Sequence, residues 1–327
     1  MKKLSVVIPV YNSEETLREV VGETIKTISG KYDYEIILVN DGSYDNVYEE
    51  IARMCQENKK IIGIDLSRNF GQHSAFMAGF NHVSGDIVMC LDDDGQTPPG
   101  EALTLLKELE RGKDLVFAKW EPKKHSAFRN LGTYIHEIMM RVLLGKPKRI
   151  VVTSYFACRR FIIDELVRNQ NPYPYVAGLL LRATRNISNV PVKHLERQQG
   201  VSGYTFKKLL SLWINGFTAF SVKPLRFATL SGSLFAMFGF VFGLVIVIRR
   251  LMNPIMVLGY SSIMATLLFM GGLIMIVLGM IGEYIGRIYI SINNAPQYVI
   301  RSTINTEQTD ENVKSTDENM KEVTNEK

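Results

Sequence analysis

Two long runs without a charged side chain constrain this chain most. Residues Phe227–Ile248 and Gly259–Ile281 are 22 and 23 residues long, and neither contains Asp, Glu, Lys or Arg. As a helix rising about 1.5 Å per residue, each run crosses a hydrocarbon layer about 30 Å thick. The short link Arg249–Leu258 makes them a predicted transmembrane hairpin with both ends on one side. Two buried core helices are the alternative, but soluble domains seldom offer two such lengths without a polar face.

A segment rich in apolar and basic residues precedes the first run. Its members are Lys207, Lys208, Leu209, Leu210, Leu212, Trp213, Phe217, Phe220, Lys223 and Arg226. Apolar side chains in lipid with cations at the headgroups are typical of an interfacial helix, which we predict over residues 206–226. The cations favour a cytoplasmic position for this segment, although Arg249 and Arg250 in the link oppose that orientation.

Composition limits the remaining chain to a folded class. Hydrophobic residues make up 46% of the 327 residues and charged residues 22%, which excludes collagen-like, wholly disordered and disulfide-scaffold proteins. The net charge of +5 favours anionic partners such as nucleotides, lipid phosphates or a membrane surface. Cys55, Cys90 and Cys158 lie far apart and form no C-x-x-C pair, which favours a reducing compartment.

The last 26 residues differ from the rest of the chain. From Ser302 to Lys327 there is no aromatic residue, and seven acidic residues stand against three lysines. Such a segment has too little apolar surface to compensate for the entropy lost on folding. We therefore predict a disordered polar tail over residues 302–327.

Strand-like and helix-like patterns alternate through the first two hundred residues. Runs of β-branched and aliphatic residues, each of strand length, occur at Leu4–Val10, Tyr34–Val39, Ile61–Leu66, Asp86–Leu91 and Asp114–Ala118. Between the first two runs, apolar residues recur at helical spacing from Leu17 to Ile28, and Asn12 or Ser13 is placed to cap that helix. This alternation predicts an α/β fold with a mainly parallel sheet, in a domain over residues 1–205.

An acidic turn follows the run at Asp86–Leu91. It reads Asp92-Asp93-Asp94-Gly95-Gln96-Thr97-Pro98-Pro99. In such sheets ligands bind beyond the carboxyl ends of the strands, where this turn would lie. The oxygens of Asp92, Asp94 and Gln96 are hard ligands suited to Mg²⁺ or Mn²⁺, which often complete their shell with phosphate oxygens. Acidic residues are also common in plain surface turns, but three adjacent carboxylates repel one another, which favours a bound cation.

Two earlier strand ends also carry polar residues. Pro9-Val10-Tyr11-Asn12 ends the first run, and Asn40-Asp41-Gly42-Ser43 ends the second. A carboxylate such as Asp41 accepts hydrogen bonds from a base or a ribose, and Tyr11 is suited to pack on a ring. Each segment alone also fits an ordinary turn, but together with the acidic turn they outline one nucleotide site.

These segments resemble a known family. Leu4–Leu17, Val39–Asp45, Ser67–Gly79 and Leu91–Pro99 resemble the nucleotide-sugar domain of GT-A type inverting glycosyltransferases. Arg197–Leu225, followed by two transmembrane helices, resembles the polyprenyl-phosphate branch of these enzymes, which includes dolichol-phosphate mannose synthases and bacterial bactoprenol glucosyltransferases. The resemblance covers nearly all of the chain before residue 300, so it implies a GT-A domain followed by an interfacial helix and a transmembrane hairpin.

The resemblance also implies roles for single residues. Asp94 and Arg197 would be catalytic, with Arg197 touching the phosphates, and Asp92, Asp94 and Gln96 would hold the metal. Family members often carry Glu right after the Tyr-Asn pair; this chain has Ser13 there, so Glu14 or Glu15 would substitute. Arg68 would lie near the diphosphate, unless Ser67–His73 is only a loop before a helix at Ser74–Val83. The expected nucleotide-binding set is Pro9, Tyr11, Asn12, Glu14, Asp41, Arg68, Asp92 and Asp93.

The implied function is transfer of a hexose-type sugar from a nucleotide sugar to polyprenyl phosphate of undecaprenyl type, for cell-envelope glycan synthesis or modification. The expected partners are the nucleotide-sugar donor, the lipid acceptor and the membrane, with no nucleic acid; a homo-oligomer is left open. The chain is expected to cross the inner (plasma) membrane more than once, with its catalytic domain and both termini cytoplasmic. The alternatives are a glycosyltransferase with another acceptor and a catalytically inert membrane sensor of nucleotide sugars.

Overall fold

The computed structural model describes residues 2–95, 97–120, 140–141, 145–192, 259–292 and 296–306, together with scattered positions between 230 and 252. The chain divides into two compact units. The first contains residues 1–134, 145–202 and 294–327, and the second contains residues 135–144 and 203–293. The first unit therefore includes chain from both sides of the predicted hairpin.

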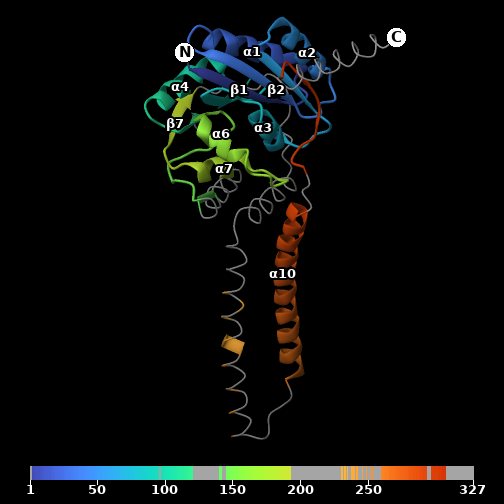
Figure 1. Ribbon diagram of the computed structural model, residues 1–327. Helices are drawn as coiled ribbons and strands as arrows, with labels where there is room; N and C mark the ends of the chain where they lie inside the picture. The colour runs from blue at the N-terminus through green and yellow to red at the C-terminus, as the bar shows by residue number, and fades with distance from the viewer. Residues whose placement is uncertain are drawn as a thin grey trace, which may run out of the picture. The chain divides into compact units, whose positions relative to one another are not determined.

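The first unit is built on one eight-stranded sheet with the order β7-β5-β6-β4-β1-β2-β3-β8 (Figure 1). Its strands are β1 Lys3–Val10, β2 Asp33–Asn40, β3 Ile61–Leu66, β4 Ile87–Cys90, β5 Leu115–Trp120, β6 Phe156–Arg159, β7 Ile187–Val192 and β8 Ile300–Ile304. The central strands β4, β1, β2 and β3 are parallel, whereas β6 is antiparallel to both of its neighbours and β8 is antiparallel to β3. The predicted mainly parallel sheet is confirmed.

Helices cover both faces of this sheet (Figure 1). One layer consists of α1 Glu14–Ile28, α2 Val47–Glu57 and α4 Ala102–Glu110, which follows the short helix η1 Pro99–Glu101. The other consists of α3 Gln72–Phe80, α6 Arg160–Leu166 and α7 Val176–Ala183. Because both faces are covered, every residue of β1 after Lys3 is buried, which explains its nearly continuous apolar sequence.

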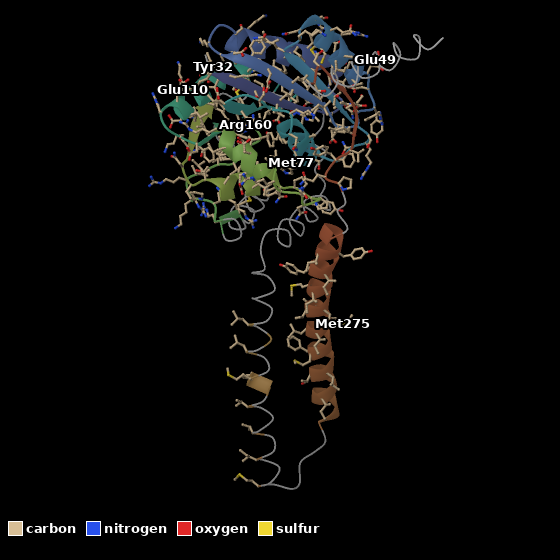
Figure 2. All side chains as sticks on the ribbon, in the orientation of Figure 1. Tyr32, Glu49, Met77, Glu110, Arg160 and Met275 are labelled. Carbon is tan, nitrogen blue, oxygen red and sulfur yellow. The ribbon has the colours of Figure 1, made fainter. Side chains whose placement is uncertain are left out.

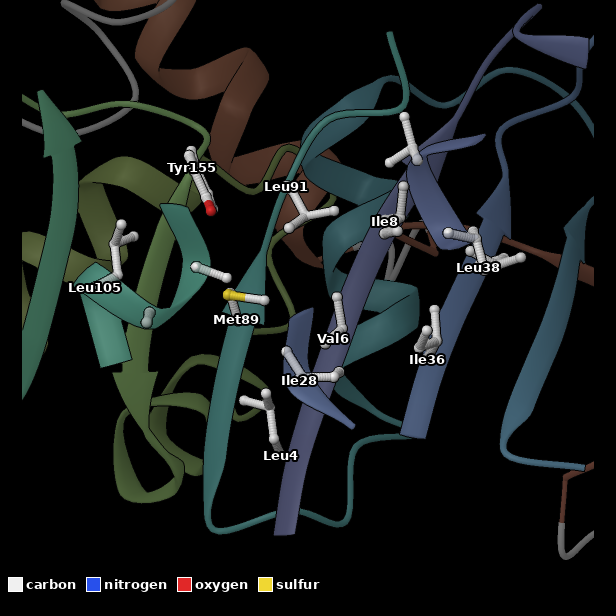
Figure 3. Close-up of a cluster of buried hydrophobic side chains, with 14 of the residues drawn as sticks. Leu4, Val6, Ile8, Ile28, Ile36, Leu38, Met89, Leu91, Leu105 and Tyr155 are labelled. Atoms are coloured by element: carbon white, nitrogen blue, oxygen red, sulfur yellow. The ribbon is translucent and has the colours of Figure 1, made fainter. Parts of the chain in front are cut away.

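Alternate residues of β1 pack against the two helical layers. Figure 3 shows Leu4, Val6 and Ile8 beside Ile36 and Leu38 of β2, in the core cluster that also contains apolar residues of α1, α2 and α4. The opposite face packs against α3. A Cβ atom on Gly79 of α3 would lie 2.5 Å from Cγ1 of Val7, so the close approach of α3 to β1 depends on this glycine.

The strand predictions are confirmed, with ends that differ by at most two residues. The helix predicted at Ser74–Val83 is also present, but it begins at Gln72 and ends at Phe80. Asn81 closes it, because its backbone N–H and its side-chain amide both donate to the carbonyl oxygen of Met77.

The structure corrects the predicted disordered tail. Strand β8 pairs with β3 in the register Gly63 to Ile304 and Asp65 to Ser302. Asn305 has a φ of 61°, and its amide donates to the carbonyl oxygens of Cys55 at 2.7 Å and Ile61 at 2.9 Å. The prediction of disorder is therefore wrong for residues 302–306, and the boundary at residue 205 omits this returning strand. Residues 307–327 lie outside the described part of the chain.

The second unit contains α10, Tyr260–Ile292, a helix of 33 residues. It includes nearly all of the predicted span Gly259–Ile281 and continues beyond it. Among the described residues it is the one helix long and apolar enough to cross a membrane: the window Phe269–Gly286 has a mean hydropathy of 1.8, and none of it is buried. Figure 2 shows side chains projecting from this helix, and Met275 is 69% exposed. Segment 206–226 and most of the first predicted span lie outside the described residues.

Candidate active site

Four loops leave the sheet at the carboxyl ends of its parallel strands. They follow β1 at Tyr11, β2 at Asp41, β3 at Ser67 and β4 at Leu91. Ligands of open α/β sheets bind beyond this edge. Hydrogen bonds between the loops hold their polar side chains in fixed positions, so the edge is a preorganised site rather than four independent turns.

The carboxylate of Asp93 ties the β4 loop to the β1 loop. Its Oδ2 accepts hydrogen bonds from Tyr11 N at 2.9 Å and Ser13 Oγ at 2.6 Å, and the Asp93 carbonyl accepts one from Thr16 Oγ1 at 2.7 Å. Burial raises the pKa of Asp93, and the bonds from Ser13 and Tyr11 oppose that rise. Ser13 occupies the N-cap position of α1, but its side chain makes no capping bond, because the hydroxyl donates to Asp93 instead.

A second pair of hydrogen bonds joins the β1 and β2 loops. Asn12 N donates to Ser43 Oγ at 3.1 Å, and Asn12 Oδ1 accepts from Tyr44 N at 2.9 Å. Asn12 has a φ of 52°, a left-handed conformation that asparagine adopts more readily than most residues. The rings of Tyr11 and Tyr44 meet edge to face at 6.4 Å and are 42% and 88% exposed. They offer an accessible apolar surface at the predicted nucleotide site.

Asp41 lies between the β2 turn and the β3 loop. Its side chain is buried, and its two oxygens accept hydrogen bonds from Phe70 N at 2.7 Å and Gly71 N at 2.9 Å. Burial raises the pKa of Asp41, and these backbone hydrogen bonds oppose the rise. A carboxylate oxygen has more than one lone pair, so Asp41 keeps acceptor capacity for a ligand.

Gly42 allows the two loops around Asp41 to touch. Its φ is +64°, and a Cβ atom there would lie 2.4 Å from the carbonyl carbon of Arg68 and 2.5 Å from Asn69 N. Both neighbours are backbone atoms, which cannot move aside as a flexible side chain can. The Asn-Asp-Gly-Ser turn therefore needs glycine for its conformation and for its contact with the β3 loop.

Asp92 receives hydrogen bonds from two elements that are distant in the sequence. Gln72 Nε2 donates to its Oδ1 at 2.8 Å, and Ser154 Oγ donates to its Oδ2 at 2.6 Å. Burial raises the pKa of Asp92 to about 6, with repulsion from Asp94 and Asp93 adding to the rise and the Ser154 and Gln72 bonds opposing it. The turn thus concentrates negative charge, which a cation would stabilise.

The residues of the acidic turn fit a divalent metal ion in their chemistry. Within the described ranges, no three His, Cys, Asp or Glu side chains converge into a ready-made metal cluster. A complete protein cage is not required, because Mg²⁺ is commonly bound by one or two carboxylates together with substrate phosphates. Asp92 and Asp94 would supply such a pair of hard oxygen ligands. Gln96, the third predicted ligand, lies outside the described residues.

The remaining predicted residues differ in where they lie. Pro9 is buried inside β1, whereas Arg68 is exposed beyond β3 with its guanidinium carbon 4.2 Å from the Phe70 ring centroid. Glu14 is exposed, and its Oε2 accepts a hydrogen bond from Asn46 N at 3.2 Å just before α2. Arg197 lies outside the described residues. The structure therefore brings Tyr11, Asn12, Asp41, Arg68 and the acidic turn to one edge, and the ligand contacts of all these residues stay predictions.

Sequence reasoning missed the supports of these side chains. Ser154 and Gln72 hold Asp92, Thr16 holds the backbone of Asp93, and Ser43 holds Asn12. The two residues of each pair are 20 to 77 residues apart, and no local pattern marks a hydroxyl as a donor to a distant carboxylate.

Comparison with known proteins identifies the class to which this fold and site belong. The profile described as Glycosyl transferase family 2 matches residues 5–167, and the profile described as GtrB C-terminal hairpin matches residues 223–288. A solved structure of glucosyl-3-phosphoglycerate synthase from Mycobacterium tuberculosis, in complex with Mn²⁺, UDP and phosphoglyceric acid, superposes with a TM-score of 0.50. It is 18% identical and covers 66% of this chain and 76% of its own. The fold is thus of the GT-A type.

Similar sequences define the family. The undecaprenyl-phosphate 4-deoxy-4-formamido-L-arabinose transferase of Proteus mirabilis is 36% identical over 318 residues, covering 95% of this chain and 97% of the relative. The transferase of the same name from Salmonella paratyphi B is also 36% identical, over 314 residues that cover 94% of this chain and 96% of the relative. The chain belongs to glycosyl transferase family 2 and carries the GtrB-type C-terminal hairpin.

Proposed function

We propose that this protein transfers a sugar from a nucleotide-sugar donor to a polyprenyl phosphate, with inversion at the anomeric carbon. The observation that carries the proposal is the presence in one chain of the polar strand-end site and the apolar helix α10, whose window Phe269–Gly286 has no buried residue. A soluble donor fits the first feature, and a lipid acceptor accounts for the second. The bacterial relatives are named as undecaprenyl-phosphate transferases, and these names support a polyprenyl phosphate as the acceptor.

Different described residues bind different parts of the donor. Tyr11 and Asp41 face the base and ribose, because an exposed ring and a fixed carboxylate recognise a flat, hydrogen-bonding ligand. Arg68 is exposed at the end of β3, where its cation attracts the diphosphate. Asn12 and Asp93 hold the loops that carry these groups.

Asp92, Asp94 and Gln96 would hold a divalent cation, either Mg²⁺ or Mn²⁺. When bound, such an ion would supply positive charge to offset the charge that develops on the diphosphate leaving group. Gln72 and Ser154 fix the Asp92 carboxylate, so that its oxygens need no reorganisation when the donor arrives. Mn²⁺ together with UDP in the solved glucosyl-3-phosphoglycerate synthase supports a divalent cation as the cofactor.

The acceptor phosphate needs no strong base. Because the second pKa of a phosphate monoester is about 6, the attacking oxygen is mostly dianionic at neutral pH. Catalysis then consists of aligning two anions that would otherwise repel, which requires cationic groups and fixed positions. Arg68 and the proposed Arg197 supply that positive charge. A single in-line attack inverts the anomeric carbon.

The acceptor is tested by measuring nucleoside diphosphate release from a panel of nucleotide sugars in detergent solution. Polyprenyl phosphate should stimulate release at least roughly 100-fold over polyprenol or free sugars, because the neutral hydroxyl is a far weaker nucleophile than the phosphate dianion. Equal stimulation by a soluble sugar would support the alternative of a glycosyltransferase with another acceptor. Release that no acceptor stimulates would contradict the proposal.

We further propose that the hairpin crosses the membrane twice and leaves both termini cytoplasmic. Strand β7 ends at Val192 and β8 begins at Ile300, and both strands belong to the same sheet of the first unit. A folded unit cannot lie on both sides of a membrane, so the chain between these strands crosses an even number of times. The helix α10 supplies one crossing, and Phe227–Ile248 is the candidate for the other.

Cysteine labelling tests this topology. In a background without Cys55, Cys90 and Cys158, single cysteines replace Asn253 in the link or Thr316 beyond β8. An impermeant thiol reagent applied to intact cells should label position 253 and leave position 316 unlabelled, although Arg249 and Arg250 oppose this orientation by charge. Labelling at position 316 would contradict the cytoplasmic assignment.

A further inference from the structure

The side chain of Arg301 in β8 contacts the end of β3 and the loop that follows it in the candidate site. Its Nη1 lies 3.3 Å from Oδ2 of Asp65, and its Nη2 donates to the carbonyl oxygen of Ser67 at 2.7 Å. The Asp65 side chain is 4% exposed, whereas that of Arg301 is 62% exposed. A nearly buried carboxylate thus depends on a cation that reaches it from the surface, supplied by a strand that follows α10.

One set of bonds leads from Arg301 to the turn that carries Asp41. Oδ1 of Asp65 accepts a hydrogen bond from Asn40 Nδ2 at 2.7 Å, and Oδ1 of Asn40 accepts one from Ser43 N at 3.1 Å. Asn40 and Ser43 flank Asp41 and Gly42, so the Asp65 carboxylate fixes the shape of this turn. Arg301 in turn fixes the Asp65 carboxylate.

A second set of bonds leads to the loop on the other side of Asp41. Ser67 is held at both ends of its peptide, since its N–H donates to the Val299 carbonyl at 2.8 Å and its own carbonyl accepts from Arg301. Three and four residues later, Phe70 and Gly71 donate their backbone N–H groups to Asp41. Arg301 is therefore connected to both segments that position the Asp41 carboxylate, the turn that carries it and the loop that donates hydrogen bonds to it.

We infer that Arg301 is a positioning residue for the donor site, holding the Asn40–Ser43 turn and the Ser67–Gly71 loop in the arrangement that presents Asp41 to the nucleotide. The inference rests on the proposed function, because the ligand of Asp41 is the nucleotide of the donor. Removing Arg301 leaves a buried carboxylate without its cation, and the two loops relax to resolvate it. Coupling is reciprocal, so nucleotide binding also stabilises residues 299–304.

Hydrogen exchange on the full chain in detergent tests the positioning without any ligand. In Arg301→Gln, the amides of Phe70 and Gly71 should exchange about tenfold faster, the effect of losing one hydrogen bond to a charged group. Ser302→Ala, in the same strand as Arg301, is the matched control. It removes the 2.7 Å contact between the hydroxyls of Ser302 and Tyr48 and keeps the contacts of the Asp65 side chain. Unchanged exchange of Phe70 and Gly71 in Arg301→Gln, or equal acceleration in Ser302→Ala, would overturn the inference.

Nucleotide binding tests whether Arg301 affects the donor site. Calorimetric titration with UDP, GDP, CDP and dTDP in the presence of Mn²⁺ identifies the probe that the wild-type protein binds most tightly. Arg301→Gln should weaken binding of that probe about tenfold and raise KM for the donor, with kcat little changed. Arg301→Lys keeps the positive charge but not the several N–H donors of the guanidinium, so it should lose less nucleotide affinity than Arg301→Gln. Ser302→Ala should bind as the wild type does.

The two possible failures are distinct. If the wild-type protein binds none of the four nucleotides, the proposed donor site is refuted and the role of Arg301 falls with it. If the wild-type protein binds a nucleotide and Arg301→Gln binds it equally well, the donor site stands and the role of Arg301 alone is refuted. A fall in kcat with unchanged nucleotide affinity would also refute the positioning role.

Discussion

Asp94→Asn should reduce sugar transfer at least roughly 100-fold, because the substitution removes a charge that holds the cation at the leaving diphosphate. The fold should survive, since Asp94 lies in a loop beyond β4 and is not part of the hydrophobic core. Steady-state transfer assays give the loss, and thermal unfolding shows whether the melting temperature is retained. Chelation of the wild-type protein with EDTA should abolish transfer in the same way, and added Mg²⁺ or Mn²⁺ should restore it.

Two other substitutions serve as controls for this result. Asp164→Asn removes a surface carboxylate whose ion pair with Arg160 is on α6, and activity should be unchanged. Asp93→Ala should instead lower stability by about 1–3 kcal/mol, because Tyr11 N and Ser13 Oγ lose their shared acceptor. Full activity of Asp94→Asn, or of the EDTA-treated protein, would contradict metal-assisted departure of the diphosphate.

A chain that ends at Val299 should be much less stable than one that ends at Thr306. The shorter chain loses the β8 ladder, the Arg301–Asp65 pair and the two hydrogen bonds from Asn305. At about 1 kcal/mol net per hydrogen bond, the loss is roughly 3 kcal/mol or more. That corresponds to a melting temperature lower by roughly 6–12 °C for a domain of this size.

The longer chain is the control for this truncation. It keeps β8 and removes only residues 307–327, so its melting temperature should stay within roughly 2 °C of the full chain. The shorter chain should also aggregate more readily, because β3 becomes an unprotected edge strand. Equal melting temperatures for the two truncated chains would show that β8 contributes nothing to the sheet.

The core of the fold was accessible from the sequence, because local pattern decides it. Apart from Ser5 and Asp65, the runs at Leu4–Val10 and Ile61–Leu66 carry no polar side chain on either face, as is typical of strands covered by helices on both sides. The helix from Glu14 to Ile28 shows its buried stripe at Leu17, Val20, Val21, Thr24 and Ile28. Periodicity of this kind needs no knowledge of distant contacts.

Strand β8 was not accessible for the same reason. Five residues at the start of a polar segment carry too little apolar surface to stand out, and only Ile300 and Ile304 mark them as a strand. Their stability comes from β3, which lies more than 230 residues earlier and offers an open edge. A pairing across such a separation leaves no trace in local composition.

In the candidate site, too, local pattern predicted some residues, and distant contacts determine the others. The position of Asp41, Asp92 and Asp94 at the carboxyl edge of the sheet was predictable, because each follows an apolar run that forms a parallel strand. The partners that orient them were not, since Ser154 reaches Asp92 from 62 residues away and Arg301 reaches Asp65 from 236 residues away. The sequence therefore indicates which side chains reach this edge, and the fold determines which groups hold them there.

The most direct measurement is mass spectrometry of the lipid product. Purified full-length protein is incubated with undecaprenyl phosphate, Mg²⁺ or Mn²⁺ and a panel of nucleotide sugars, and the lipid fraction is analysed intact and after mild acid. We expect a lipid whose mass exceeds that of the acceptor by one sugar residue, with an acid-labile glycosyl–phosphate bond and an equal amount of nucleoside diphosphate released. Recovery of unmodified lipid with every donor would contradict the proposed transfer.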